Sequence, residues 1–436
     1  MLDQTSLWYK LQYPECFVNE EERMLQKVLA DFTDKEIMPV RDQIDDDVTH
    51  KKIINPILKK LQVDLGCQKN AIPKDYGGNQ LSIVACALKQ EQIGRGDYGI
   101  SMHSAVTEWA WVPVLLAYLG PFSPKAKAWA KAVLDKFAPK FVENELRVGC
   151  FNMSETESAC DIENPYNEGR TIRVRAKLEG NEWVINGNKF WASNAGIADL
   201  NCVVCNMDPR LGIDAFALIY VPEPWPGVSH GKFEVKCGMQ ADRNTSTYFD
   251  NVRVPKEWGL QGPEAWAIFK NTLAAPMPLN SAHAVGILQG AFDVLLEYTG
   301  QRVVGGKLIN QHLSSAMILG EMASVITVAR AAFLELAYQY DHMDIYGPWN
   351  TDSMMAKGHA VHVFTTRTMP DLILKGMELM GSYGYVRENH YEKYYRDAAV
   401  AKLVLGGVQL GYFATCRQFY DLDYSSFGPG KLQKPA

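Results

Sequence analysis

The chain of 436 residues is 47% apolar and 22% charged, which predicts a globular protein with a large core and two or three domains at roughly 150 residues each. Its net charge of −6 argues against a nucleic-acid partner, because phosphate binding needs a basic surface. It contains neither a run of about 18 apolar residues nor a basic N-terminal start followed by an apolar stretch, so we expect no membrane span and no signal peptide.

Residues 1–148 have the pattern of an α-helical domain. Apolar residues recur at spacings of three and four, acidic residues lie at the start of the first stretch, and the stretches at 53–68 and 81–96 stop near glycine. The predicted helices lie at residues 19–44, 53–68, 81–96, 96–111 and 120–147. The last of these is rich in lysine, which is typical of a solvated helix face.

Residues 149–262 change to short alternating runs and predict an antiparallel β domain. The sequences "EGNE" at 179–182 and "NGN" at 186–188 are hairpin signals between such runs. Further strands are expected at residues 199–207, 214–223, 227–235 and 245–255.

Residues 263–436 return to helical periodicity and predict a C-terminal four-helix bundle. The four long stretches are residues 276–303, 309–343, 350–381 and 395–422. The fold class expected for the whole chain is therefore α+β, with a helical domain, a β domain and a helical bundle in that order.

The nine cysteines are scattered, which favours reduced thiols and a cytoplasmic protein. Cys202 and Cys205 have redox spacing, but they lie in an apolar run with β character, where alternation puts the two thiols on opposite faces. We therefore interpret them as strand core. No second cysteine or histidine pair at ligand spacing completes a zinc site, and no metal is expected.

Several segments, taken in order and spacing, resemble the acyl-CoA dehydrogenase superfamily of flavoproteins. They are "FNMSETESACDI" from Phe151, "GNEWVINGNKFWASNAG" from Gly180, "GMQADRNTSTYFDNVRVPKEWGL" from Gly238, "GQRVVGGKLINQHLSSAMILGEMA" from Gly300 and "ELMGSYGYVRENHYEKYYRDA" from Glu378. The resemblance spans nearly the whole chain. It implies FAD between the β domain and the bundle, an acyl-CoA thioester substrate, an electron-transfer flavoprotein as acceptor, and a homotetramer or homodimer.

The resemblance also assigns residues to the cofactor. It places Ser154 beside the flavin pyrimidine edge, and Trp191 and Ser193 beside the flavin ring and its N5. The residues that it assigns to the rest of FAD are Arg302 for the pyrophosphate from a neighbouring subunit, Gly381 and Gly384 for a partner's diphosphate, and Gly406, Gly407 and Gln409 for the adenosine. These types fit, because flavin needs hydrogen bonds at N5 and N1–C2, pyrophosphate needs a guanidinium, and close backbone approach needs glycine.

Structural alternatives stay open for these residues. Trp191 would equally suit a core aromatic of the β domain, and Arg302 a surface helix charge. Gly381 and Gly384 would suit an ordinary helix stop.

The chain departs from the resembled family where the catalytic base belongs. The motif "RDAAVAKLVLGGVQ" places Leu405 where most members carry the glutamate that removes a proton beside the thioester. The alternative glutamate position of some members falls at about Pro276, followed by Met277 in place of a basic residue. Cys160 replaces a serine near the end of the first motif. The residues expected near the thioester therefore differ from those of most members of the resembled family.

The helix at 96–111 matches the helix that lines the far end of the acyl pocket, and it supplies the candidate bases. Residues three and four apart share a helix face, which groups Tyr98 with Met102 and Gly99 with His103 and Thr107. His103 is the first candidate base, and Asp97 and Glu108 are the second choices. Gly99, Met102, Cys160 and Leu405 are the expected substrate contacts.

Each candidate base has a structural alternative. His103 would suit a buried hydrogen-bonding residue, Asp97 a helix cap, and Glu108 a solvated residue or a salt bridge. His283, on the first bundle helix, is a weaker candidate.

The sequence thus predicts FAD-dependent desaturation of an acyl-CoA, with an alicyclic or branched acyl group and a base at a non-standard position. In the resembled family, members that act on ring thioesters use an acid of the pocket-lining region in place of the lost glutamate. Two alternatives remain. One is a flavin-dependent monooxygenase or oxidase of the same fold, and the other is a catalytically silent subunit of a heteromeric dehydrogenase.

Overall fold

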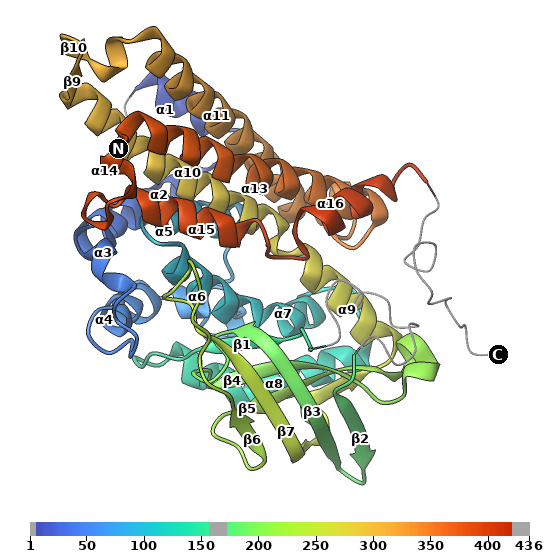
Figure 1. Cartoon of the computed structure of the whole chain (residues 1–436). Helices are drawn as coiled ribbons and strands as arrows, with labels where there is room; N and C mark the ends of the chain where they lie inside the picture. The colour runs from blue at the N-terminus through green and yellow to red at the C-terminus, as the bar shows by residue number, and fades with distance from the viewer. Residues whose placement is uncertain (1–5, 157–171, 421–436) are drawn as a thin grey trace.

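The structure is a computed structural model that describes residues 6–156 and 172–420. The molecule has three layers (Figure 1). The β-sheet lies at one end, the long helices α10, α11 and α13 lie at the other, and α6, α7 and α9 lie between them. This arrangement confirms the predicted α+β fold class.

The N-terminal segment is helical, as predicted. Its α-helices are α1 (Leu7–Gln12), α2 (Glu20–Phe32), α3 (Arg41–Ile44), α4 (Ile54–Lys59), α5 (Ile83–Gly96), α6 (Tyr98–Trp109), α7 (Val112–Leu119) and α8 (Pro124–Val142). Helix α2 begins at a capping box, in which Asn19 and Glu22 satisfy each other's main-chain N–H groups. Helices α5, α6 and α8 each begin after a side-chain cap, from Ser82, Asp97 and Ser123.

The β segment forms one sheet with the strand order β6-β7-β3-β2-β4-β5-β8, and β1 pairs with β4. The strands are β1 (Gly149–Asn152), β2 (Arg175–Glu179), β3 (Glu182–Ser193), β4 (Leu200–Asn206), β5 (Phe216–Pro222), β6 (Val228–His230), β7 (Asn244–Pro255) and β8 (Gly259–Gln261). The sheet is mixed, because β1 and β2 run parallel to β4. The prediction of a purely antiparallel domain was wrong in this respect, since alternation reveals that a strand exists but not its direction.

Two local predictions in this segment also need correction. The first predicted turn, at Gly180 and Asn181, does join β2 to β3 in a hairpin. The second predicted turn, "NGN" at 186–188, lies inside β3. There Gly187 has φ +128° and the pairing with β7 shifts register, so the sequence marks a bulge and not a turn. Of the strand expected at 227–235, only Val228–His230 forms.

The C-terminal segment contains the predicted long helices, but the fourth is broken. Its elements are α9 (Pro263–Ala274), α10 (Pro276–Gln301), β9 (Val303–Val304), β10 (Lys307–Leu308), α11 (Leu313–Asp341), α12 (Met343–Tyr346), α13 (Asp352–Met380), α14 (Ser382–Tyr385), α15 (Tyr391–Ala401) and α16 (Gly407–Cys416). The break falls before α16, where Leu405, Gly406 and Gly407 have φ of +52°, +77° and +67°. Left-handed residues cannot continue a right-handed helix, so the chain turns here.

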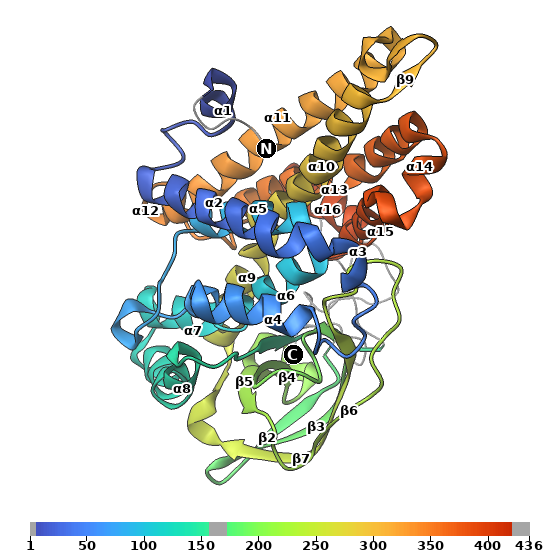
Figure 2. The same cartoon turned by 90° about the vertical axis from the view of Figure 1, so that its left-hand side faces the viewer.

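The hydrophobic cores cross the predicted domain boundaries. Helix α8 packs Trp129 and Phe137 into the same core as strand residues such as Phe216. Helix α5 packs Leu88 into the core of the long bundle helices. Figure 2 shows the same division, with α2 and α5 beside the bundle and α7 and α8 beside the sheet. The N-terminal helices therefore stabilise both of the other layers.

Helix α11 is, within the described residues, the one helix long and apolar enough to cross a membrane by length and composition, and 33% of its most apolar stretch is buried. One such helix is weak evidence for a span, because bundle helices of globular proteins pass the same test. In this molecule α11 packs beside α10 and α13. It also buries Arg330, which donates to Glu91 and Gln12.

Candidate active site

Strand β3 ends in an irregular segment that turns an aromatic side chain outward. Its pairing with β7 shifts register between Lys189 and Ala192, and Trp191 has φ +58°. The indole of Trp191 is 60% exposed. The neighbouring Phe190 donates its main-chain N–H to the carbonyl of Ser154 at 2.8 Å. Ser154 and Trp191 are thus brought together, and the exposure of Trp191 excludes the alternative of a core aromatic.

Ser193, two residues beyond Trp191, is held by the loop before β7. Its hydroxyl donates to Asp242 Oδ2 at 2.6 Å. Asn244 donates through Nδ2 to the carbonyl of Trp191 at 3.0 Å and reaches Ser193 Oγ at 3.3 Å. Lys236 donates to Asn244 Oδ1 and to the carbonyl of Asp242, both at 2.5 Å. These contacts fix the backbone and the hydroxyl at the outward-facing edge of β3.

The carboxyl group of Asp242 is fully buried. Burial raises the pKa of Asp242 to about 6, although Lys236 and the hydrogen bond from Ser193 lower it. Its Oδ1 has no hydrogen-bond partner among the described residues. Asp242 was not among the predicted site residues, although it lies within the motif that begins at Gly238. The available signal was an acidic residue in an otherwise apolar and turn-forming stretch.

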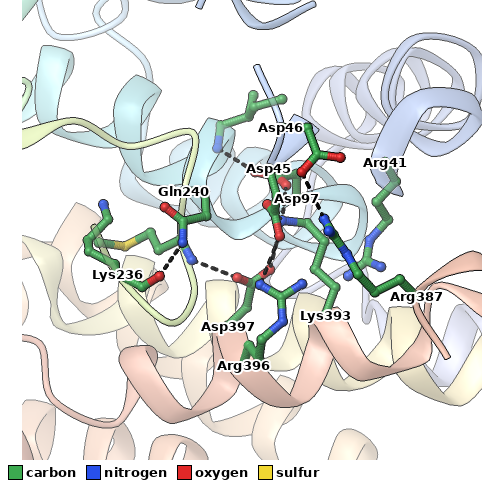
Figure 3. A network of polar contacts seen from close by, with 12 residues as sticks. Arg41, Asp45, Asp46, Asp97, Lys236, Gln240, Arg387, Lys393, Arg396 and Asp397 are labelled. Carbon is green, nitrogen blue, oxygen red and sulfur yellow. Dashed lines mark hydrogen bonds and ion pairs between the residues drawn. The ribbon is translucent and has the colours of Figure 1, made fainter. Parts of the chain in front are cut away.

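A buried polar network joins all three segments of the chain beside this loop (Figure 3). Lys393 of α15 forms ion pairs with Asp45 and with Asp97, the latter at 3.0 Å. Asp397 accepts a hydrogen bond from the main-chain N–H of Met239 at 2.7 Å. Arg396 pairs with Asp45 at 2.8 Å and donates to the carbonyl of Cys237 at 3.0 Å. The "RDA" motif therefore anchors the loop that carries Asp242.

Helix α6 carries the candidate bases, and its faces differ in exposure. The side chains of Met102, Ala105 and Trp109 are partly exposed and share one face. Gly99 and Thr107 lie on a buried face that meets the β segment. A Cβ on Gly99 would lie 2.9 Å from the main-chain nitrogen of Asp242. Of the two predicted substrate contacts on α6, Met102 is on the open face and Gly99 is against protein.

His103 lies on the buried face of α6 and is 1% exposed. Burial, with a smaller effect from the nearby His50, lowers the pKa of His103 to about 3. Its Nδ1 has no partner among the described residues, and its main-chain carbonyl accepts from Asn194 Nδ2 at 3.0 Å. The imidazole is therefore neutral at pH 7, inside the joint between α6 and the sheet. His283 of α10 is similar, since burial lowers its pKa to about 3.

Each of the two acidic candidates forms an ion pair with a buried lysine. Asp97 caps α6 by accepting from the N–H of Ile100 at 2.8 Å, and it also pairs with Lys393. Glu108 forms a buried ion pair with Lys89 of α5 and accepts from Asn70 Nδ2 at 3.0 Å. The structural alternatives for both residues, a helix cap and a salt bridge, are therefore present in the fold.

The two positions that would hold a glutamate in the resembled family are close to one apolar cluster. Leu405 is partly buried and packs in the same cluster as Met277, beside Tyr340 and Trp349. Pro276 forms the first residue of α10. A second group that sequence reasoning missed lies nearby. Burial lowers the pKa of His362 of α13 to about 4, an effect opposed by the main chain of Val404.

The remaining predicted cofactor residues lie far from Trp191 within one chain. Arg302 ends α10, and its guanidinium lies 5.9 Å from the ring centre of Tyr383. Gly381 and Gly384 flank Tyr383 at the end of α13. Figure 1 shows this end of the bundle, marked by α14 and β9, pointing away from the sheet. Gly381 also caps α13, so its structural alternative fits as well.

Gly406, Gly407 and Gln409 form a third location at the start of α16. A Cβ on Gly406 would lie 2.2 Å from a side-chain carbon of Leu410, which explains the glycine. Gln409 is exposed on α16. Cys160 lies outside the described residues.

Three family models match successive parts of the chain. They are the N-terminal domain of acyl-CoA dehydrogenase over residues 19–127, its middle domain over residues 150–252, and its C-terminal domain over residues 266–409. Their order matches the order of the three segments seen in the structure.

Named relatives match over most of the chain. Cyclohexane-1-carbonyl-CoA dehydrogenase of Syntrophus aciditrophicus is 28% identical, with 88% of this chain and 93% of the relative covered. The mitochondrial short-chain specific acyl-CoA dehydrogenase of Bos taurus is 27% identical, with 92% and 90% covered. The solved structure of butyryl-CoA dehydrogenase from Megasphaera elsdenii superposes with a TM-score of 0.80 at 21% identity, and 92% and 98% of the two chains are covered.

These likenesses agree with one another along the chain and with the observed order of helices, mixed sheet and bundle. The protein therefore belongs to the acyl-CoA dehydrogenase superfamily of flavoprotein oxidoreductases.

Proposed function

We propose that the protein is an FAD-dependent dehydrogenase that desaturates an acyl-CoA thioester with an alicyclic or branched acyl group. The observation that carries this proposal is the apolar environment at the usual base positions, where Leu405 packs in one cluster with Met277, the residue that follows Pro276. A substrate whose acidic proton lies on a more distant carbon does not need a base there. Relatives named cyclohexane-1-carbonyl-CoA and cyclohex-1-ene-1-carbonyl-CoA dehydrogenase support the same substrate class.

The residues at the edge of β3 fit a flavin ring. Trp191 offers an exposed aromatic face, and Ser154 and Ser193 offer polar groups beside it. When bound, FAD would supply the hydride acceptor. A second copy of the chain would supply those remaining FAD contacts that lie too far from Trp191 within one chain. The remaining proposed contacts are Arg302, Gly381, Gly384, Gly406 and Gln409. A homo-oligomer is therefore part of the proposal.

The exposed apolar residues of α11 support such an oligomer. Leu313, Met317 and Val328 are 77%, 67% and 56% exposed on a helix whose other face packs in the bundle. Large exposed apolar side chains on one element are typical of a protein interface. An electron-transfer flavoprotein as acceptor and a cytoplasmic location complete the proposal. The eight cysteines of the described residues are all free thiols, which supports a reducing compartment.

For the proton acceptor we propose His103. Asp97 and Glu108 are the other candidates, but each is already paired with a buried lysine. The imidazole of His103 is neutral and its Nδ1 is not engaged, although the burial that lowers its pKa to about 3 also makes it a weak base in this position. It adjoins Met102, which lies on the open face of α6. The apolar Met102 and Leu405 would contact the acyl group, while Gly99 and Cys160 remain proposed contacts.

The test is anaerobic reduction of the bound flavin by a panel of thioesters. The loss of the visible absorbance of the flavin measures the reduction. The panel contains cyclohexanecarbonyl-CoA, cyclohex-1-enecarbonyl-CoA, isobutyryl-CoA and butyryl-CoA. We expect a ring or branched thioester to reduce the flavin faster than butyryl-CoA does. If no thioester reduces it, the dehydrogenase proposal fails. A monooxygenase or oxidase, or a silent subunit of a heteromeric enzyme, would then replace it.

A further inference from the structure

The hydrogen bond between Ser193 and Asp242 determines which way the serine hydroxyl points. A hydroxyl has one proton to donate and lone pairs that accept. The proton of Ser193 is directed at Asp242 Oδ2 at 2.6 Å, and an ionised carboxylate only accepts. Asn244 Nδ2 approaches the hydroxyl oxygen of Ser193 at 3.3 Å as a donor. The group that Ser193 can offer to a ligand is therefore a lone pair.

The fold holds Asp242 in this arrangement from several sides. Its main chain is packed against Gly99 of α6, and its carbonyl accepts from Lys236. The loop before it is anchored to α15 through Asp397 and Met239. Asp242 Oδ1 is buried without a hydrogen-bond partner among the described residues, and the carboxyl group accepts the hydrogen bond from Ser193 through Oδ2. The main chain at Asp242 is therefore held by contacts with α6, with Lys236 and, through Met239, with α15.

We propose that Asp242 is a positioning residue that withholds the Ser193 proton from the cofactor, so that Ser193 faces flavin N5 as a hydrogen-bond acceptor. This inference rests on the proposed function, which places a flavin ring beside Ser193. The N5 atom of oxidised flavin is itself an acceptor, whereas N5 of reduced flavin carries a hydrogen and donates. Ser193 would therefore match the reduced form and not the oxidised form. Removing the Asp242 carboxylate would free Ser193 to donate to N5 of the oxidised form.

The experiment compares the binding of two oxidised cofactors to the flavin-free protein. 5-Deaza-FAD has a C–H group in place of N5 and cannot accept a hydrogen bond there. We measure the ratio of the dissociation constants for 5-deaza-FAD and FAD in the wild type, S193A, D242A and the double variant at pH 7.5. We expect the preference for FAD to rise about fivefold in D242A, as one neutral hydrogen bond gives. It should be unchanged in S193A and return to the wild-type value in the double variant.

A pH change tests the same point without a substitution at Asp242. Burial raises the pKa of Asp242 to about 6, so lowering the pH from 7.5 to 5 protonates the carboxyl group and weakens its hold on the Ser193 proton, because a neutral carboxyl oxygen is a weaker acceptor than a carboxylate oxygen. The preference of the wild type for FAD should then rise, while that of S193A should not. S193A is the matched control for the other titratable and charged groups around Asp242, which are Lys236, Arg243, Asp97, Tyr98, Lys393 and Asp397.

Two failures are distinguishable. If the protein does not bind FAD, the proposed function fails and takes this inference with it. If FAD binds but the preference is unchanged in D242A and at pH 5, or rises equally when Ser193 is alanine, the inference alone is overturned. If D242A does not fold, the pH comparison between the wild type and S193A decides the point.

Discussion

The two sides of the proposed site differ in what they bury. The sheet side, formed by Trp191, Ser193 and Asp242, buries a carboxyl group and holds a hydroxyl group in one orientation. The loop side, formed by Leu405 with Met277 and Pro276, buries apolar side chains where relatives are expected to carry an acid. The two sides therefore differ in polarity, and the sheet side carries a buried carboxyl group whose desolvation is costly.

The largest expected effect is on stability, and it tests whether both sides depend on neutral histidines. Burial lowers the pKa to about 3 or 4 in four histidines, which are His50, His103, His283 and His362. A depressed histidine pKa means that the unfolded chain binds more protons than the native state between pH 4 and 6.5. Stability is therefore present above about pH 6.5 and is lost as the pH falls.

Several buried acids oppose this trend, since burial raises the pKa of Glu108, Asp293 and Asp397. Burial raises the pKa of Asp242 and Asp341 to about 6, so their cost is relieved as the pH falls below 6. Four histidines at about 2 kcal/mol each, less Asp242 and Asp341 at about 1.4 kcal/mol each, set an upper limit of about 5 kcal/mol on the loss at pH 5 relative to pH 7.5. Denaturant unfolding at the two pH values measures it. His103→Asn on the sheet side and His362→Asn on the loop side should each weaken the pH dependence.

The next effect isolates the anchor of the sheet side. Lys393→Ala removes the cation shared by Asp45, Asp97 and Asp397, and it should reduce the free energy of unfolding by about 3–5 kcal/mol, since buried acids lose their partner. Lys375→Ala is the matched control, because Lys375 pairs with Glu321 at the surface and should cost at most about 1 kcal/mol. Equal losses in the two variants would mean that the junction does not stabilise the fold as described.

A third prediction asks which side supplies the proton acceptor. His103→Asn should slow flavin reduction by a ring thioester about 100-fold, the lower end of what general-base catalysis contributes, without loss of bound FAD. His283→Asn is the control, because His283 is equally buried and has a similarly low pKa. Stopped-flow absorbance measures the rate. Full activity of His103→Asn, with loss of activity in His362→Asn, would move the acceptor to the loop side.

Most of the fold could be predicted from the sequence, but strand direction and the break in the last helix could not. The helical spacing of apolar residues at 395–422 continues through Leu405 and therefore predicts one helix. Two helices that meet at a left-handed turn can keep the same spacing of apolar residues. The assignment of Ser154, Trp191 and Ser193 to the flavin came from the resemblance to the family and stays a prediction, and the structure brings Phe190, beside Trp191, against Ser154. Asp242 and His362 were not predictable from the sequence, because their roles depend on burial and on partners more than 40 residues away, namely Ser193 and Asn280.

The smallest expected effect comes from a substitution that gives the loop side the acidic residue expected in its relatives. Leu405→Glu places a carboxyl group beside Met277 and Tyr340, where burial should raise its pKa. We expect flavin reduction by butyryl-CoA to increase about tenfold over the wild type, the lower limit of a misplaced general base. Leu405→Gln, which has the same size and no charge, should show no gain. A gain in both variants would assign the change to shape and not to proton removal.

The sharing of cores between layers limits how this protein can be cut or recombined. Because α5 is enclosed by the bundle and α8 covers the sheet, excising residues 149–262 would strip the sheet of Trp129 and Phe137 and expose its apolar face to water. A chimera that exchanges only the β segment with a relative would have to match the α8 surface as well. The unit that evolution and protein engineering can exchange is therefore the sheet together with α7 and α8, and not the contiguous block that the sequence suggests.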